Sequence, residues 1–192
     1  MLRLTNISKT FNPGTEDAKT ALDDLSLSVA DGDFITIIGA NGAGKSTFLR
    51  MLSGDLEPST GTVELDPKLR MSVLRQDHFA FDDCTVVDTI IQGNKRLYEI
   101  MQEKDALYAK DPFTEEDGNR AAELEAEFAE LDGWNADTEA ARLLQGLGLK
   151  ADDILYSGMK YRTDAEKVKI LLAQALFGKP DIMLLDEPTN HL

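Results

Sequence analysis

A glycine-rich segment, Gly39–Ser46 (GANGAGKS), constrains the fold of this chain more than any other part of its sequence. It follows a short apolar run, Phe34–Ile38, and runs into a stretch with helical spacing that begins at Lys45. Glycines allow the backbone to curl until several N–H groups point inward at one phosphate, and the positive end of the following helix adds to that field. The sequence therefore predicts a phosphate-binding loop between a strand and a helix.

The segment fits the pattern G-x-x-x-x-G-K-[ST], the Walker A motif, and it has the strand-to-helix context that this motif requires. We expect Lys45 to place its charge on the β- and γ-phosphates of a nucleotide, and the hydroxyl of Ser46 to hold Mg²⁺. A glycine-rich turn without a ligand is the alternative interpretation. The residues predicted to contact the nucleotide in this loop are Gly39, Asn41, Gly42, Ala43, Gly44, Lys45, Ser46 and Thr47.

Two periodicities alternate along the rest of the chain. Residues Leu22–Val29 alternate apolar and polar side chains, as an antiparallel strand with one solvated face does. Phe34–Ile38 and Ile182–Leu185 are nearly all apolar, which predicts strands buried on both faces, whereas Lys167–Phe177 has helical spacing. The predicted strands are Leu2–Ile7, Leu22–Val29, Phe34–Ile38, Gly61–Leu65, Met71–Leu74 and Ile182–Leu185. Strands that alternate with helices indicate an α/β domain.

The sequence from about Val86 to Leu149 is almost wholly helical and strongly acidic. Residues 93–145 hold 14 acidic and 6 basic side chains, within a chain whose net charge is −15. Affinity for phosphate backbones comes mainly from Lys and Arg, so this composition opposes DNA, RNA and anionic membranes. We expect a helical insertion with a solvated acidic face and no direct nucleic-acid patch, in which Trp134 anchors a turn between two helices.

We predict the cellular compartment from features that the sequence lacks. No apolar run approaches the roughly 20 residues that cross a bilayer, and the N-terminus does not resemble a signal peptide. The single cysteine, Cys84, cannot form an internal disulfide. We therefore expect no membrane segment and a cytoplasmic location.

Two adjacent acids, Asp186 and Glu187, end the apolar run Ile182–Leu185. Strand ends are often acidic for solubility, so the pair is weak evidence by itself. It lies about 140 residues after the Walker A motif, where it is the matching Walker B element. We expect Asp186 to bind Mg²⁺ through water and Glu187 to polarise the attacking water.

Together with a glutamine after a strand, Gln76, and the ending DEPTNHL, these motifs make the chain resemble an ATP-binding-cassette (ABC) ATPase over essentially its whole length. The resemblance implies a P-loop NTPase fold, with N-terminal antiparallel strands and an inserted helical subdomain. It implies that Phe11 stacks on adenine, worth roughly 1–3 kcal/mol, with a core Phe as the alternative. It also implies that Gln76 senses Mg²⁺ and the γ-phosphate, with a surface glutamine as the alternative.

The resemblance and the motifs together assign the following catalytic, metal-binding and partner roles. The expected catalytic residues are Glu187, Lys45 and Gln76. The expected metal contacts are Ser46, Gln76 and Asp186, and the expected cofactors are ATP and Mg²⁺. The implied partners are the nucleotide and a second ABC cassette, arranged head to tail.

The resemblance divides between two subfamilies. From about residue 65 onward the chain resembles ABC-F proteins, which are soluble tandem-cassette ATPases that act on ribosomes, so the ribosome is an implied partner. The opening, from Thr10 to Leu27, is more similar to the ATPase subunit of a membrane transporter. A chimera or an engineered sequence is the interpretation that this division favours.

Two departures from the family pattern affect the expected activity. Arg162-Thr163-Asp164-Ala165-Glu166 stands where the family has its signature Leu-Ser-Gly-Gly-Glu, so we expect impaired hydrolysis. The chain ends at Leu192, before the switch histidine, and His191 belongs to the D-loop, so we expect a cassette that is incomplete at its C-terminus. Residues 1–83 and 165–192 are predicted as the ATP-binding core, and residues 84–164 as the helical insert with the degenerate signature.

Three functions stay open from the sequence. The first is an ABC-type ATPase of ABC-F ancestry that binds Mg-ATP and turns it over slowly. The second is a nucleotide-binding module, engineered or natural, that does not hydrolyse. The third is an ATP-binding subunit fragment of an ABC transporter, which would need a membrane partner.

Overall fold

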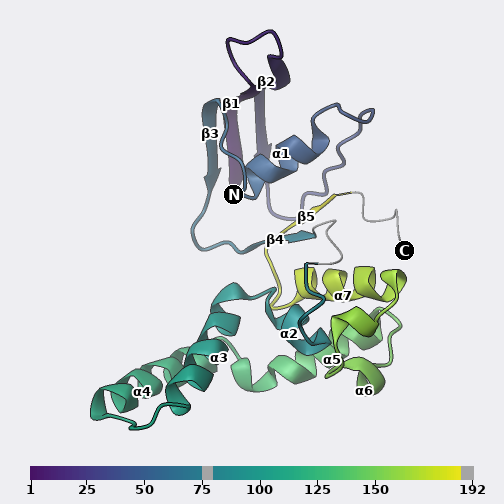
Figure 1. Ribbon diagram of the computed structural model, residues 1–192. Helices are drawn as coiled ribbons and strands as arrows, with labels where there is room; N and C mark the ends of the chain where they lie inside the picture. Colours follow the sequence, from purple (N-terminus) through teal and green to yellow (C-terminus); the bar gives the residue numbers. More distant parts are fainter. Residues whose placement is uncertain (75–79, 187–192) are drawn as a thin grey trace. The chain divides into compact units, whose positions relative to one another are not determined.

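The computed structural model describes residues 1–74 and 80–186, and it divides them into two compact units (Figure 1). We call residues 1–73 with 181–186 the sheet unit, and residue 74 with 80–180 the helical unit. The helix Asp164–Leu176 belongs to the helical unit by its contacts. The assignment of residues 84–164 as an insert in an ATP-binding core stays a prediction.

A three-stranded antiparallel sheet in the order β2-β1-β3 forms most of the sheet unit. Its strands are β1 (Leu2–Phe11), β2 (Lys19–Val29) and β3 (Thr60–Leu65), close to the predicted ranges. Leu4 of the central strand pairs with Leu27 on one side and with Val63 on the other. Alternate side chains of a strand point to the same face of a sheet. Leu2 and Leu4 therefore lie together on the face that is buried.

Helix α1 (Lys45–Leu52) covers the buried face of this sheet. Phe48, Met51 and Leu52 are its buried residues, at the i, i+3 and i+4 spacing of an apolar helix face. The helix ends just before Gly54, whose φ is 77°, a left-handed conformation that suits a helix end. The predicted start at Lys45 and the predicted stop at Gly54 are both confirmed.

Two further strands form a separate two-stranded sheet in the sheet unit, and here two predictions are wrong. β4 (Met71–Leu74) pairs with β5 (Ile182–Leu185), but Leu185 is 37% exposed, so β5 is not buried on both faces. Phe34–Ile38 is not a strand, and Phe34 and Ile38 are 91% and 90% exposed. Burial on both faces requires neighbouring strands and covering helices, and none of the described strands pairs with Phe34–Ile38.

The helical unit is built from six α-helices and two short 3₁₀-helices in the described residues. They are α2 (Val86–Ile91), α3 (Lys95–Tyr108), α4 (Glu115–Glu130), η1 (Gly133–Asn135), α5 (Ala136–Gly146), α6 (Ala151–Ile154), η2 (Met159–Tyr161) and α7 (Asp164–Leu176). Fully buried side chains from four of these helices, Ile90, Leu97, Leu124 and Ile170, belong to one core. The predicted helical block is confirmed.

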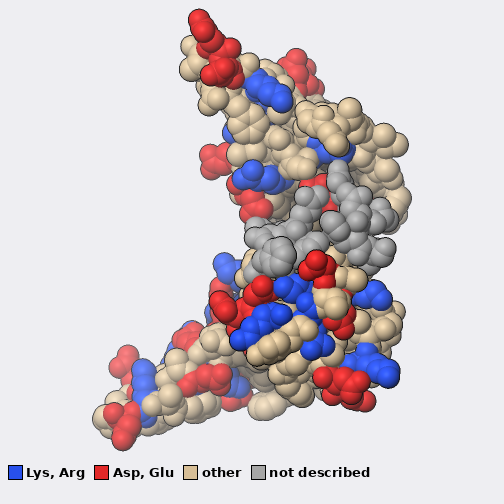
Figure 2. Space-filling view, turned by 45° about the vertical axis from the view of Figure 1, so that its right-hand side comes forward, with Lys and Arg blue, Asp and Glu red and all other residues tan. Residues whose placement is uncertain are grey.

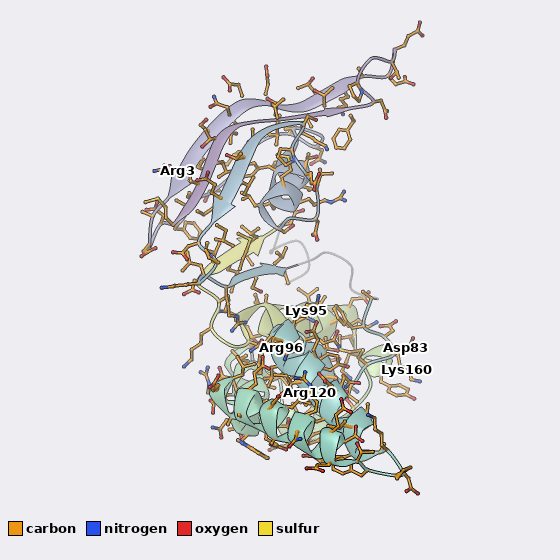
Figure 3. The ribbon with its side chains drawn as sticks, turned by 90° about the vertical axis from the view of Figure 1, so that its left-hand side faces the viewer. Arg3, Asp83, Lys95, Arg96, Arg120 and Lys160 are labelled. Carbon is orange, nitrogen blue, oxygen red and sulfur yellow. The ribbon has the colours of Figure 1, made fainter. Side chains whose placement is uncertain are left out.

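Ion pairs join α3 to α4 across the acidic surface of this unit. Arg96 contacts Glu127 at 2.5 Å, and Arg120 contacts Glu103 at 2.7 Å (Figure 3 labels both arginines). Figure 2 shows basic and acidic side chains interspersed over the helical unit. The ring of Trp134 meets that of Phe128 edge-on at 5.1 Å, just after α4, which agrees with its predicted role at a turn. No helix in the described residues is long and apolar enough to cross a membrane.

Candidate nucleotide-binding site

The loop Gly39–Ser46 has a left-handed backbone, which favours glycine, at two positions. Gly42 and Gly44 have φ values of 82° and 89°, in the left-handed region. A Cβ atom on Gly44 would lie 2.5 Å from the carbonyl oxygen of Ala21 on β2, which is closer than real Cβ atoms come to backbone. The loop is therefore pressed against β2 at the point where α1 begins.

The first turn of α1 presents its backbone N–H groups without competition from side chains. Gly44 is the N-cap and makes no side-chain hydrogen bond, and the first turn contains no acidic residue. The free N–H groups and the helix dipole together favour an anion at this end. The arrangement matches what a phosphate group requires.

Lys45 lies folded across the loop. Its Nζ donates hydrogen bonds to the carbonyl oxygens of Gly39 at 2.9 Å and of Ala40 at 3.2 Å. These are weak neutral acceptors, so a charged phosphate oxygen would be a stronger partner for the ammonium group. Lys45 is thus held beside the loop with its charge available to an anion.

A cavity of about 280 Å³ adjoins the loop, but its walls do not suit a triphosphate. Apart from Ser26 and Lys45, the side chains that line it are apolar. They come from β2 (Leu22, Leu25 and Leu27), from the loop and the run before it (Ile37, Ile38 and Ala43) and from α1 (Phe48). The polar and charged groups that could meet a phosphate are therefore those of the loop backbone and Lys45 at the edge of this cavity.

Phe11 ends β1 and is 38% exposed as a residue, and Nζ of Lys9 lies 5.7 Å from the ring centroid. This exposure disfavours the alternative that Phe11 is a core residue. A ring with an open face is able to stack on a planar base.

The structure describes only some of the remaining predicted site residues. Asp186 follows β5 in the sheet unit and is half-buried. Gln76 and Glu187 lie outside the described residues. In the described residues Ser46 has no hydrogen-bond partner for its hydroxyl, and no three acidic, His or Cys side chains cluster. Ser46 and Asp186 supply hard oxygen ligands, which fits Mg²⁺ held mainly by phosphates and water.

The side chains of Thr163 and Glu166 cap the N-terminus of α7. Oγ1 of Thr163 accepts a hydrogen bond from the Glu166 N–H at 3.3 Å, and Oε2 of Glu166 accepts one from the Thr163 N–H at 2.8 Å. The hydrogen bond from the Thr163 backbone holds the pKa of Glu166 below its usual range. Asp164 in the same turn is exposed. The carboxylate of Asp164 thus stands where the family signature has a glycine, whereas Glu166 matches the glutamate of that signature.

Sequence reasoning missed two features of the helical unit. The Thr163–Glu166 capping box was visible as T-x-x-E before an apolar run. The second feature, an ion pair between Lys167 and Asp82, left no local signal because its partners are 85 residues apart.

The loop, the helix that it opens and the mixture of strands and helices define a P-loop NTPase of the α/β class. Residues 22–190 match the family model described as ABC transporter, so the chain belongs to that family, whose cassettes bind and hydrolyse ATP. Solved structures of the dimeric ABC transporter cassette MJ0796 agree, with a TM-score of 0.66 at 20% identity over 100% of this chain and 76% of theirs. This likeness confirms the predicted fold.

Curated relatives refine the comparison. The uncharacterized ABC transporter ATP-binding protein YkpA of Bacillus subtilis is 54% identical over 192 residues, which are 100% of this chain and 34% of YkpA. The probable ATP-binding protein YbiT of Escherichia coli is 45% identical over the same length, 35% of YbiT. The energy-dependent translational throttle protein EttA of Mycobacterium tuberculosis is 32% identical over 91% of this chain and 31% of EttA.

Two statements follow from these relatives. The chain spans about a third of the length of the curated proteins that it matches. Natural proteins align with the chain from end to end, so the divided resemblance at about residue 65 gives no support for a chimera.

Proposed function

We propose that this chain binds Mg-ATP through the loop Gly39–Ser46. The observation that carries the proposal is the left-handed Gly44, seated against β2, which opens α1 with a first turn free of carboxylates. Lys45 then exchanges its loop carbonyls for the β- and γ-phosphates. Mg²⁺, held by Ser46 and Asp186, supplies charge neutralisation at those phosphates when bound.

The other roles in the proposal rest on the sequence motifs. Phe11 stacks on adenine from the end of β1. Gln76 senses the γ-phosphate and Mg²⁺, and Glu187 orients the attacking water. The backbone N–H groups of the loop, with Asn41 and Thr47 at its sides, surround the phosphate chain.

Hydrolysis in this proposal is slow, because the start of α7 does not suit a phosphate. The family signature offers backbone and hydroxyl donors to the γ-phosphate of a second cassette, whereas Asp164 brings a carboxylate there. Two like charges about 4 Å apart cost roughly 1–4 kcal/mol at effective dielectric constants between those of water and a protein surface. The closed pair of cassettes is therefore disfavoured.

The process in which the chain acts is, in our proposal, translation. The observation that supports this part is that the relatives include EttA, a protein named as an energy-dependent translational throttle. ABC-F ancestry, a second cassette in head-to-tail arrangement, the ribosome as a partner and a cytoplasmic location follow as parts of the same proposal.

Isothermal titration calorimetry with Mg-ATP tests the proposal. Lys45→Ala should weaken binding about 10- to 100-fold, because a charged hydrogen bond is worth about 1.5–3 kcal/mol. Chelation of Mg²⁺ with EDTA should weaken binding to the parent chain as well. Lys68→Ala is the matched control, since Lys68 is an exposed lysine of the same unit and its loss should change nothing. Equal affinities of the parent and Lys45→Ala would refute the assignment of the loop.

A further inference from the structure

Phe11 lies near the end of β2 that also contacts the phosphate-binding loop, and both belong to the sheet unit. Phe11 pairs with Lys19, the first residue of β2. Gly44 of the loop packs against the carbonyl oxygen of Ala21, two residues further along the same strand. Two residues of a strand span about 7 Å, so the ring and the loop lie at one end of the sheet. This spacing suits a ligand with a phosphate at one end and a planar group at the other.

Lys9 holds its ammonium group over one face of the Phe11 ring. Its Nζ lies 5.7 Å from the ring centroid, within the distance of about 6 Å at which a cation is attracted to an aromatic face. The same Nζ donates a hydrogen bond to the carbonyl oxygen of Glu57 at 2.7 Å, three residues before β3 begins. Lys9 is therefore held at a second point, and a planar ligand can stack only on the opposite face of the ring.

The backbone between Lys9 and Phe11 is held from two sides. The N–H of Thr10 donates to Oγ of Ser59 at 3.2 Å, on the segment that leads into β3. The hydroxyl groups of Thr10 and Thr20 lie 3.0 Å apart, which joins the same residue to β2. The side chain of Phe11 is then the part that a ligand must order, and ordering an exposed side chain weakens binding. A contact that orders the ring beforehand removes that cost.

We propose that Lys9 is a positioning residue for the nucleobase, a proposal that rests on the function proposed above. Lys9 acts through Phe11: it holds the ring at the end of the sheet where the loop binds phosphate, and its charge strengthens the hold on the ring face that the base does not use. Loss of Lys9 should therefore weaken the binding of a nucleotide without weakening the binding of a triphosphate that has no base.

The experiment compares the affinities for Mg-ATP and for inorganic Mg-tripolyphosphate by isothermal titration calorimetry. The ratio of the two affinities reports on the nucleoside, because the loop contacts are common to both ligands. Phe11→Leu should reduce the ratio about fivefold or more, since it removes the stack on the base. Lys9→Met should reduce the ratio about threefold or more, with the affinity for tripolyphosphate unchanged. Lys9→Arg keeps a cation and a donor and should keep the ratio.

Two controls separate positioning from a general effect of charge. Lys19 is an exposed lysine that pairs with Phe11 across the strands, so Lys19→Met removes the same charge at the same end of the sheet. It should leave the ratio unchanged. In a chain that already carries Phe11→Leu, Lys9→Met should change the ratio no further, because Lys9 acts through the ring.

Each other outcome contradicts one statement. A parent that binds neither Mg-ATP nor Mg-tripolyphosphate contradicts the proposed function. A Lys9→Met variant that keeps the parent's ratio overturns the inference and leaves ATP binding intact. The inference is also overturned if Lys19→Met lowers the ratio as much, or if Lys9→Met lowers it equally in the Phe11→Leu chain. If Lys9→Met loses its affinity for tripolyphosphate as well, Lys9 supports the sheet unit in general and has no positioning role.

Discussion

A side chain at Gly44 would conflict with both the backbone conformation of the loop and its packing against β2. Its φ of 89° is disfavoured for residues with a Cβ atom, and that atom would lie 2.5 Å from the Ala21 carbonyl oxygen. The strain of the left-handed conformation alone is worth about 1–2 kcal/mol. A change here therefore affects both the loop and its seat on β2.

We expect Gly44→Ala to lower the free energy of unfolding of the sheet unit by at least about 2 kcal/mol and to weaken Mg-ATP binding. Thermal unfolding and calorimetry measure the two effects. Gly146→Ala, in α5, is the control, since a Cβ there meets nothing within 4 Å and alanine favours a helix. A Gly44→Ala variant as stable as the parent would show that the loop has another conformation in solution.

Asp117 shows how a single carboxylate makes the helical unit sensitive to acid. Hydrogen bonds from Lys110 and from the side chain and N–H of Thr114 lower its pKa from 3.8 to about 2. A lowered pKa in the folded state stabilises the fold above the unfolded value, and the stabilisation is lost as the pH falls towards the folded value. Asp117 therefore contributes fully above about pH 4 and little at pH 2.

The test is the difference in melting temperature between the parent and Asp117→Asn across this range. We expect the variant to melt lower than the parent at pH 7, and the difference to shrink between pH 4 and pH 2. Asp105→Asn, in α3, removes a nearby carboxylate for comparison and should show no such trend. A difference that is constant with pH would mean that the charge of Asp117 does not matter.

At the scale of elements, α2 and α7 approach each other too closely for any side chain at Gly93. A Cβ atom there would lie 1.9 Å from the carbonyl oxygen of Gln174. Because that neighbour is helix backbone, it cannot move aside without shifting α7. Gly93 thus fixes the distance between the C-terminal end of α2 and α7.

Gly93→Ala should destabilise the helical unit by about 1–3 kcal/mol through overpacking. Denaturant unfolding followed by the fluorescence of Trp134, the single tryptophan, reports on this unit. Gly118→Ala, in α4, should instead be neutral or stabilising, because the nearest atom to its Cβ is 3.8 Å away. Equal unfolding midpoints for Gly93→Ala and the parent would contradict the close approach.

Elements whose pattern is local could be predicted from the sequence, and elements that depend on neighbours could not. The alternation in β1 and the apolar face of α1 each reflect one buried side, so residue spacing was sufficient. The run Phe34–Ile38 was predicted as a buried strand from composition alone, and composition does not reveal whether neighbouring strands are present. In the candidate site, the motif located the loop and Lys45, whereas the packing of Gly44 against the Ala21 carbonyl of β2 required the tertiary fold.

At the scale of the whole molecule, our proposal makes the start of α7 decide whether two copies come together on ATP. The capping box pairs the N–H groups of Thr163 and Glu166 within the chain, and Asp164 places an exposed carboxylate in the same turn. That carboxylate opposes a phosphate presented by another cassette.

Replacing Arg162–Ala165 with Leu, Ser, Gly and Gly should therefore promote dimerisation by Mg-ATP. The serine retains the cap on α7, and Glu187→Gln, in both the parent and the repaired chain, should retain the bound ATP. Analytical ultracentrifugation with ATP and with ADP measures the dimer, and only the repaired chain with ATP should form it. Dimerisation by ATP of the unrepaired chain, together with turnover of several per second in the unrepaired chain that keeps Glu187, would show that this segment is not disabling.

Phe34–Ile38 has a consequence for how the chain must be handled. An apolar, β-branched run with no proline and no charge is a template for intermolecular cross-β stacking when it is exposed, as Phe34 and Ile38 are here. Asp31 and Asp33 immediately precede the run and act as gatekeepers, since each stacked copy would bring their charges into register. Two carboxylates that have no part in the proposed chemistry of this chain therefore act against its self-association, and replacing both with Asn should make the chain aggregate more readily.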